Sequence, residues 1–152
     1  MNKNLYNSKL EEGLSRLQCE LVAERNRVNT DNISWFQYDL LECLYKTNGS
    51  RPAELSSRLG VSRSKISKGL KILKDIGYIK QEKSSYDARE LWTELTDKGF
   101  KFLKNTEKGH EHLAEIASTA LNENEQVLFA ELCFKVSKIF EERRGHYDRK
   151  ND

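Results

Sequence analysis

The chain has 152 residues, a length that suits one domain or a small domain with an appended helical part. Hydrophobic residues make up 37% and charged residues 33%, as in many water-soluble helical proteins. The sequence lacks a run of about 18 apolar residues and a secretory signal, so we expect no membrane span. The odd and widely spaced Cys19, Cys43 and Cys133 exclude a disulfide framework, which makes the cytoplasm the expected compartment.

Positive charge is concentrated in the middle of the chain. Residues 50–90 hold ten Lys or Arg against five Asp or Glu, whereas the rest of the chain is slightly negative. Proteins that bind nucleic acid gain much of their affinity by neutralising phosphates, so this distribution indicates a polyanion-binding module. A solvated helical face is the alternative explanation, but such a face does not usually concentrate charge in this way.

Apolar spacing predicts two helices before the basic region. Leucines recur at intervals of three and four residues between Leu10 and Leu21, which predicts a helix over about residues 5–28. A second helix of about three turns begins near Ile33, and the turn residues 47–50 end it.

A pair of short helices follows. Pro52 suits the first turn of a helix, because its missing N–H would be unpaired there in any case. Gly60 marks the end of this helix, and Ser62 is placed to cap the N-terminus of the next one, which runs to Gly77. The expected buried side chains of the two helices are Leu55, Leu59, Ile66, Leu70 and Leu73.

A hairpin and further helices complete the chain. Residues 78–81 and 90–95 predict two strands joined by the polar loop 84–89. After Asp97 the helical spacing returns, with a last helix starting near Asn122. Two short helices around a Gly-containing turn, followed by a hairpin, are the order of a winged helix-turn-helix. The expected fold is therefore mainly α (α+β).

The second short helix of such a pair enters the major groove of DNA. Its outer face carries basic and hydroxyl side chains, namely Arg63, Ser64, Lys65, Ser67, Lys68, Lys71 and Lys74. Arg and Lys can donate to guanine O6 and N7, and Ser can pair with several base edges. Lys71 and Lys74 lie toward the end of the helix, where phosphates are the expected partners. A lysine-rich surface helix without a partner is the alternative.

Two blocks of sequence carry a resemblance to a known family. They are ELSSRLGVSRSKISKGLKILKDIGYI, from Glu54 to Ile79, and YDARELWTELTDKG, from Tyr86 to Gly99. With these blocks, residues 33–104 resemble the MarR (multiple-antibiotic-resistance regulator) family of transcriptional regulators. The resemblance implies homodimers joined through the N- and C-terminal helices, a pseudo-palindromic operator in double-stranded DNA, and a repressor released by a small ligand or by oxidation.

The resemblance also implies roles for single residues. The family's major-groove positions match Ser64, Lys65, Ser67 and Lys68. Arg89 matches the wing arginine that reaches the minor groove or its phosphates, and Asp87 matches the acidic residue that helps to fix the wing. The chain departs from the family at Ala88, where many members have a further basic residue.

The expected organisation follows from these assignments. It consists of an N-terminal dimerisation helix (1–32), a winged helix-turn-helix DNA-binding domain (33–97), C-terminal dimerisation helices (98–145) and a charged tail (146–152). The long apolar stripes of the terminal helices support dimerisation, because a small central domain cannot cover them alone.

The cysteines leave an alternative function open. Cys43 and Cys133 lie on apolar helical stripes, so we expect both to be buried and unreactive. Cys19 lies off its stripe, and some family members sense oxidants through a cysteine in the N-terminal helix. A thiol-based redox sensor is therefore an alternative, although Cys19 has Glu20 and no lysine as its neighbour, which does not favour a reactive thiolate.

Other sites are less favoured. His110 and His112 lie two residues apart on a helix and point in different directions, so no metal or cofactor is expected. Trp35, Phe36 and Tyr38 could line an effector pocket for an aromatic compound in the dimer crevice, but core and interface packing is the favoured explanation. The sequence has no enzyme signature. A winged-helix protein-interaction module without DNA binding is a further alternative, which the basic charge argues against.

Overall fold

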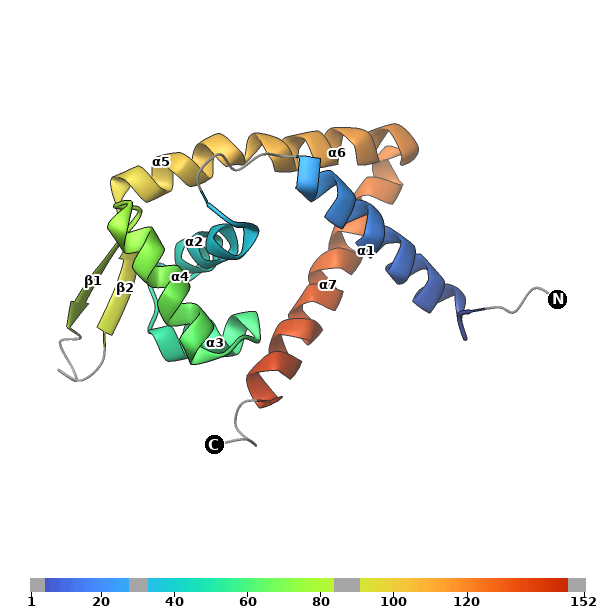
Figure 1. Ribbon diagram of the computed structural model, residues 1–152. Coiled ribbons are helices and arrows are strands. Elements are labelled where there is room, and N and C mark those ends of the chain that lie inside the picture. The colour runs from blue at the N-terminus through green and yellow to red at the C-terminus, as the bar shows by residue number, and fades with distance from the viewer. Residues whose placement is uncertain (1–4, 28–32, 84–90, 148–152) are drawn as a thin grey trace. The chain divides into compact units, whose positions relative to one another are not determined.

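A computed structural model describes residues 5–27, 33–83 and 91–147, without the side chains of 108 and 145–147 (Figure 1). The contacts divide the chain into two units, Met1–Asp31 and Asn32–Asp152. In the described residues, the first unit contains one helix, and the second contains the remaining helices and a two-stranded sheet. None of the described helices combines the length and the apolar character needed to cross a bilayer.

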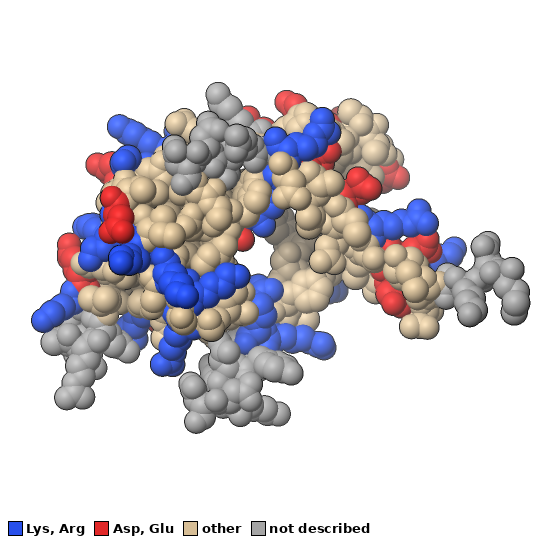
Figure 2. Space-filling view, viewed as in Figure 1, with Lys and Arg blue, Asp and Glu red and all other residues tan. Residues whose placement is uncertain are grey.

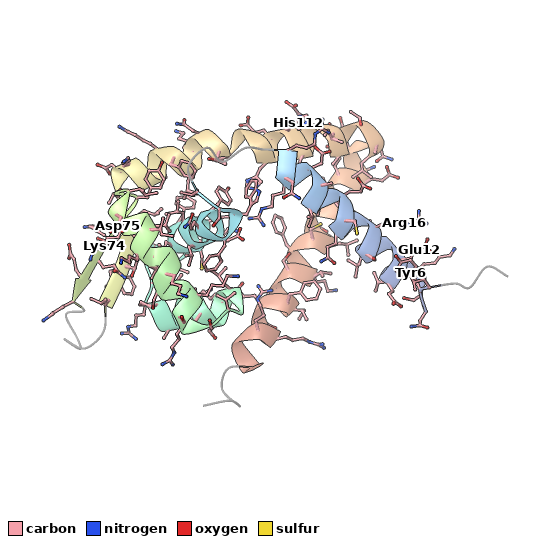
Figure 3. The ribbon with its side chains drawn as sticks, in the orientation of Figure 1. Tyr6, Glu12, Arg16, Lys74, Asp75 and His112 are labelled. Carbon is pink, nitrogen blue, oxygen red and sulfur yellow. The ribbon has the colours of Figure 1, made fainter. Side chains whose placement is uncertain are left out.

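The first unit is the helix α1 (Lys9–Arg27), as the leucine spacing predicts. Surface contacts fix its first turns, because Glu12 pairs with Arg16 at 2.7 Å and the Tyr6 hydroxyl lies 3.2 Å from Ser15 Oγ (Figure 3). No residue of α1 is buried, and its leucines are exposed. Among the described residues of the first unit, nothing covers the apolar stripe of this helix.

The second unit begins with α2 (Trp35–Thr47), the central helix of the core. Ser34 and Gln37 form a capping box at its N-terminus, and it ends at Asn48, which has a left-handed backbone with φ 52°. Gly49 follows with φ 95°, and a side chain there would lie 2.7 Å from the indole nitrogen of Trp92. Local signals therefore set both ends of α2.

The helix-turn-helix has the predicted boundaries. It consists of α3 (Pro52–Leu59) and α4 (Arg63–Asp75). Gly60 caps α3 in the left-handed conformation with φ 63°, and the Ser62 hydroxyl accepts a 3.3 Å hydrogen bond from the backbone N–H of Lys65. Pro52 occupies the first turn of α3, where it interrupts no hydrogen bond.

The predicted hairpin is formed by β1 (Ile79–Lys83) and β2 (Leu91–Leu95). The two strands pair antiparallel, with Ile79 opposite Leu95. Backbone hydrogen bonds in both directions between Ser50 and Thr93, 2.9 and 3.0 Å long, fasten β2 to the segment before α3. The hairpin is therefore anchored to the helix-turn-helix at its base.

The core of the second unit lies between α2, α4, the hairpin and α5 (Asp97–Thr106). The fully buried large apolar side chains are Leu40, Leu41, Leu44, Leu55, Ile66 and Leu73. All three side chains expected inside α4 are buried, as is Leu55 of α3, whereas Leu59 is half-buried. The inner faces predicted from the spacing are thus confirmed.

The last two helices are α6 (Lys108–Ala120) and α7 (Glu123–Tyr147). Helix α7 includes the first two residues, 146 and 147, of the expected charged tail. The prediction that Cys133 is buried is wrong, because its side chain is exposed on α7. No other described segment buries the apolar side chains on this side of α7. Helical spacing shows which residues share a side of a helix, but not whether another segment packs against that side.

Candidate nucleic-acid interface

Helix α4 has one buried and one basic face. Ile66 and Leu73 are completely buried on the inner side. The outer side is exposed and carries the side chains proposed to contact DNA, Arg63, Ser64, Lys65, Ser67, Lys68 and Lys71. Lys74 and Asp75 mark the end of the helix (Figure 3). Figure 2 shows basic side chains gathered over α3 and α4 on the visible face.

The N-terminal end of α4 is open to solvent and free of acidic residues in its first turn. The Ser62 hydroxyl caps the backbone N–H of Lys65, and the positive end of the helix dipole lies at this end of α4. Arg63 and Ser64 project from this end. An anion such as a backbone phosphate is the natural partner of this arrangement.

Lys65 has a contact that sequence reasoning missed. Its ammonium lies 4.6 Å from the centre of the Phe36 ring on α2, a cation–π geometry. Phe36 can approach because Gly69 has no side chain, and a Cβ at Gly69 would lie 2.9 Å from the ring. The glycine in the middle of α4 was the available signal for this close approach. Lys65 is thus turned toward α2 while it stays exposed.

The wing is described only at its base. Asp87 and Arg89, the predicted wing residues, lie outside the described residues. On the strands, Lys80 pairs with Glu94 at 2.6 Å. This hydrogen bond raises the pKa of Lys80 and lowers that of Glu94, so both groups stay charged at neutral pH. Lys83, the last residue of β1, is also exposed.

A cavity of about 290 Å³ lies between α2 and the α5–α6 segment. Its walls are formed by Tyr38, Glu42, Tyr45, Phe100, Leu103, Lys104, Glu107 and His110. The rings of Tyr45 and Phe100 are 5.8 Å apart, and those of Tyr38 and His110 are 6.1 Å apart. Of the three aromatic residues considered from the sequence, only Tyr38 lines this cavity, whereas Trp35 and Phe36 pack against the core.

The thiols are free in the structure. Cys19 is exposed and Cys43 is half-buried on α2. Burial raises the pKa of the Cys43 thiol, an effect that the nearby Arg58 partly offsets. The described residues contain no group of three or more His, Cys, Asp or Glu side chains placed to hold a metal ion.

Comparison with known proteins places this arrangement in context. Residues 33–91 match the model of the MarR family, which spans α2, the helix-turn-helix and the first part of the wing. The search of curated protein sequences found no match.

Solved structures resemble almost the whole chain. A MarR protein from Peptoclostridium difficile shares 19% identity and a TM-score of 0.75, with 95% of each chain covered. Streptococcus pneumoniae FabT in complex with DNA shares 20% identity and a TM-score of 0.70, covering 88% of this chain and 96% of that one. The PcaV transcriptional regulator of Streptomyces coelicolor, in complex with its natural ligand, shares 22% identity and a TM-score of 0.64, covering 82% and 89%. These likenesses confirm the predicted fold, a winged helix-turn-helix with long terminal helices.

Proposed function

We propose that this chain is a winged-helix transcriptional regulator of the MarR family and that it represses transcription by binding a pseudo-palindromic duplex operator as a homodimer. The observation that carries the proposal is the exposed basic face of α4, held against the core by a buried apolar face. The proposed membership of this family agrees with the expectation that the chain is not an enzyme.

In the proposed complex, α4 lies in the major groove. Ser64, Ser67 and Lys68 project from its first two turns, where base edges are within reach of such a helix. Arg63 and Lys71 meet the flanking phosphates, which contribute affinity without sequence preference. Lys65 can contact the DNA in two ways. Its ammonium either moves away from the Phe36 ring to reach a base edge, or stays over the ring and faces a phosphate. Arg89 of the wing is proposed to reach the neighbouring minor groove or its phosphates, and Asp87 is proposed to help fix the wing.

Dimerisation is proposed from the exposed apolar side chains of α7. Between 40% and 75% of their surface is exposed in Val127, Leu128, Phe129, Leu132, Phe134, Val136, Ile139 and Phe140. Six of them, Leu128, Phe129, Leu132, Val136, Ile139 and Phe140, share one side of the helix by its spacing. An exposed apolar side of this kind is unfavourable in water, and a two-fold axis would bury it against its own copy. The apolar stripe of α1 offers a second surface of the same kind. Sedimentation that shows only a 17.7 kDa species at micromolar concentration would exclude the homodimer.

A small aromatic effector is proposed to occupy the cavity between α2 and α5–α6. The aromatic rings of Tyr38, Tyr45 and Phe100 suit a planar ligand, and Lys104 and His110 offer polar contacts. The ligand complex of PcaV is consistent with effector control in a protein of this fold. Substituting Phe100→Ala should weaken release of DNA by such an effector without weakening DNA binding itself.

The DNA-binding proposal is tested by selecting a preferred duplex from a random library and titrating variants by fluorescence anisotropy. Lys68→Ala should lose about 1–3 kcal/mol per half-site on the selected duplex and relax its preference at one position. Arg89→Ala should weaken binding to selected and scrambled duplexes alike, with a shallower salt dependence.

The matched control is Lys101→Ala, which removes the same charge from the exposed side of α5. It should leave both affinities close to wild type. If Lys68→Ala and Arg89→Ala also bind like wild type, the assignment of recognition helix and wing is wrong, and a protein-interaction module becomes the better explanation.

A further inference from the structure

The C-terminal helix α7 returns to the helix-turn-helix and contacts it through charged groups. The guanidinium of Arg58, in the last turn of α3, forms an ion pair with the Glu141 carboxylate. One turn further along α7, Arg144 Nε donates a 2.9 Å hydrogen bond to the backbone carbonyl of Arg58. The side chain and the backbone of Arg58 are therefore both bound by α7, and Figure 1 shows α3 beside the lower end of that helix.

This contact lies at the turn that leads into the recognition helix. The carbonyl of Arg58 is one of the last carbonyls of α3, which have no partner within the helix, so Arg144 satisfies a group that would otherwise need water. The Arg144 side chain also crosses the turn, because a Cβ on Gly60 would lie 3.2 Å from its Cδ. Ser62, two residues after Gly60, already caps α4.

Helix α7 also carries the apolar side chains that the proposed homodimer buries. Its main contacts with the rest of the second unit are with α3 and α6. A change in the angle between α7 and α3 would therefore move α4 relative to the two-fold axis. The separation of the two recognition helices must match half-sites about 34 Å apart, one turn of DNA.

We propose that Glu141 and Arg144 are positioning residues that hold the turn before α4 and thereby set the half-site spacing that the dimer accepts. The proposal rests on the proposed function, since it concerns the DNA that a homodimer of this chain binds. Neither residue needs to contact DNA, because both act through Arg58.

Cys43 offers an independent probe of this contact. It lies on α2, half-buried and close enough to Arg58 and Glu141 for their charges to act on its thiol. If the contact opens, a thiol reagent should reach Cys43 more easily. The measurement requires a Cys19→Ser/Cys133→Ser background, because these two thiols are exposed and would otherwise react first.

The main experiment compares the affinity for the selected operator with that for duplexes whose half-sites are moved one base pair apart or together. The quantity measured is the ratio of the two affinities within each variant, so a uniform loss of DNA affinity or of folded protein cancels. Glu141→Gln should reduce this spacing preference about two- to fivefold, the range expected from loss of an exposed ion pair. It should also make Cys43 react faster.

Two further variants complete the design. The charge swap Arg58→Glu/Glu141→Arg restores an ion pair and should restore the spacing preference. Glu142→Gln removes the same charge from the next, exposed residue of α7 and should behave like wild type. The positioning role is overturned if Glu141→Gln keeps the spacing preference of wild type. It is also overturned if the charge-swap variant shows the same reduced spacing preference as Glu141→Gln. A wild-type protein that binds no preferred duplex overturns the proposed function, and this inference with it.

Discussion

The substitution Gly99→Ala should destabilise the second unit severely. Gly99 lies in the first turn of α5, where the helix passes the end of β1. A Cβ at this position would lie 2.1 Å from the carbonyl oxygen of Tyr78 and 3.0 Å from its carbonyl carbon. That oxygen accepts a 3.0 Å hydrogen bond from the backbone N–H of Thr96. Because the obstacle is backbone fixed by a hydrogen bond, no side-chain rotation can relieve the clash.

The magnitude follows from three contributions. Alanine is preferred over glycine in a helix by about 1 kcal/mol, which favours the variant. Overpacking costs about 1–3 kcal/mol, and the upper end applies where backbone must move. Displacing the Tyr78 carbonyl also weakens its hydrogen bond to Thr96, which contributes about 1 kcal/mol. We therefore expect a net loss of about 2–3 kcal/mol and a fall in Tm of about 5–10 °C.

Urea unfolding followed by circular dichroism measures this loss. Gly13→Ala is the matched control, because a Cβ at Gly13 on α1 meets nothing within 4 Å among the described residues. It should be neutral or stabilising by up to about 1 kcal/mol. If Gly99→Ala unfolds at the same urea concentration as wild type, the close approach of α5 to Tyr78 is not a feature of the folded protein, and the packing argument fails.

The remaining predictions concern the helix caps and a thiol. Ser62→Ala removes the N-cap of α4 and should reduce stability by about 1 kcal/mol in thermal unfolding, while Ser62→Thr should retain most of it. Cys19→Ser should bind and release DNA like wild type after peroxide treatment, and a variant that no longer responds where wild type does would identify a redox sensor. Partial burial opposes ionisation of Glu54, but hydrogen bonds from the Arg51 backbone N–H and the Ser50 hydroxyl outweigh it and hold the pKa of Glu54 below its ordinary 4.5. Because the pKa is lower in the folded state, ionised Glu54 stabilises the protein above pH 4.5, and this contribution is lost as pH falls through the lowered pKa. Over this pH range the free energy of unfolding should therefore fall more in wild type than in Glu54→Gln. Equal losses in urea titrations would contradict this.

Local signals in the sequence determined the elements and indicated the proposed function class. Pro52, Gly60 and Ser62 set the ends of the two short helices, because each acts on backbone groups within a few residues of itself. The period of the apolar residues identified the inner face of α4, and with it the outward direction of Lys68 and its basic neighbours.

Only the tertiary structure decided what meets across the fold. Tyr38 and His110 share a cavity although they belong to α2 and α6, and Glu141 reaches Arg58 across 83 residues of sequence. Cys133 shows the same limit, since a stripe at helical spacing is equally consistent with a core and with an uncovered face. Periodicity reports which residues share a side of a helix. The partner of that side depends on the packing of segments distant in sequence, which local backbone preferences do not encode.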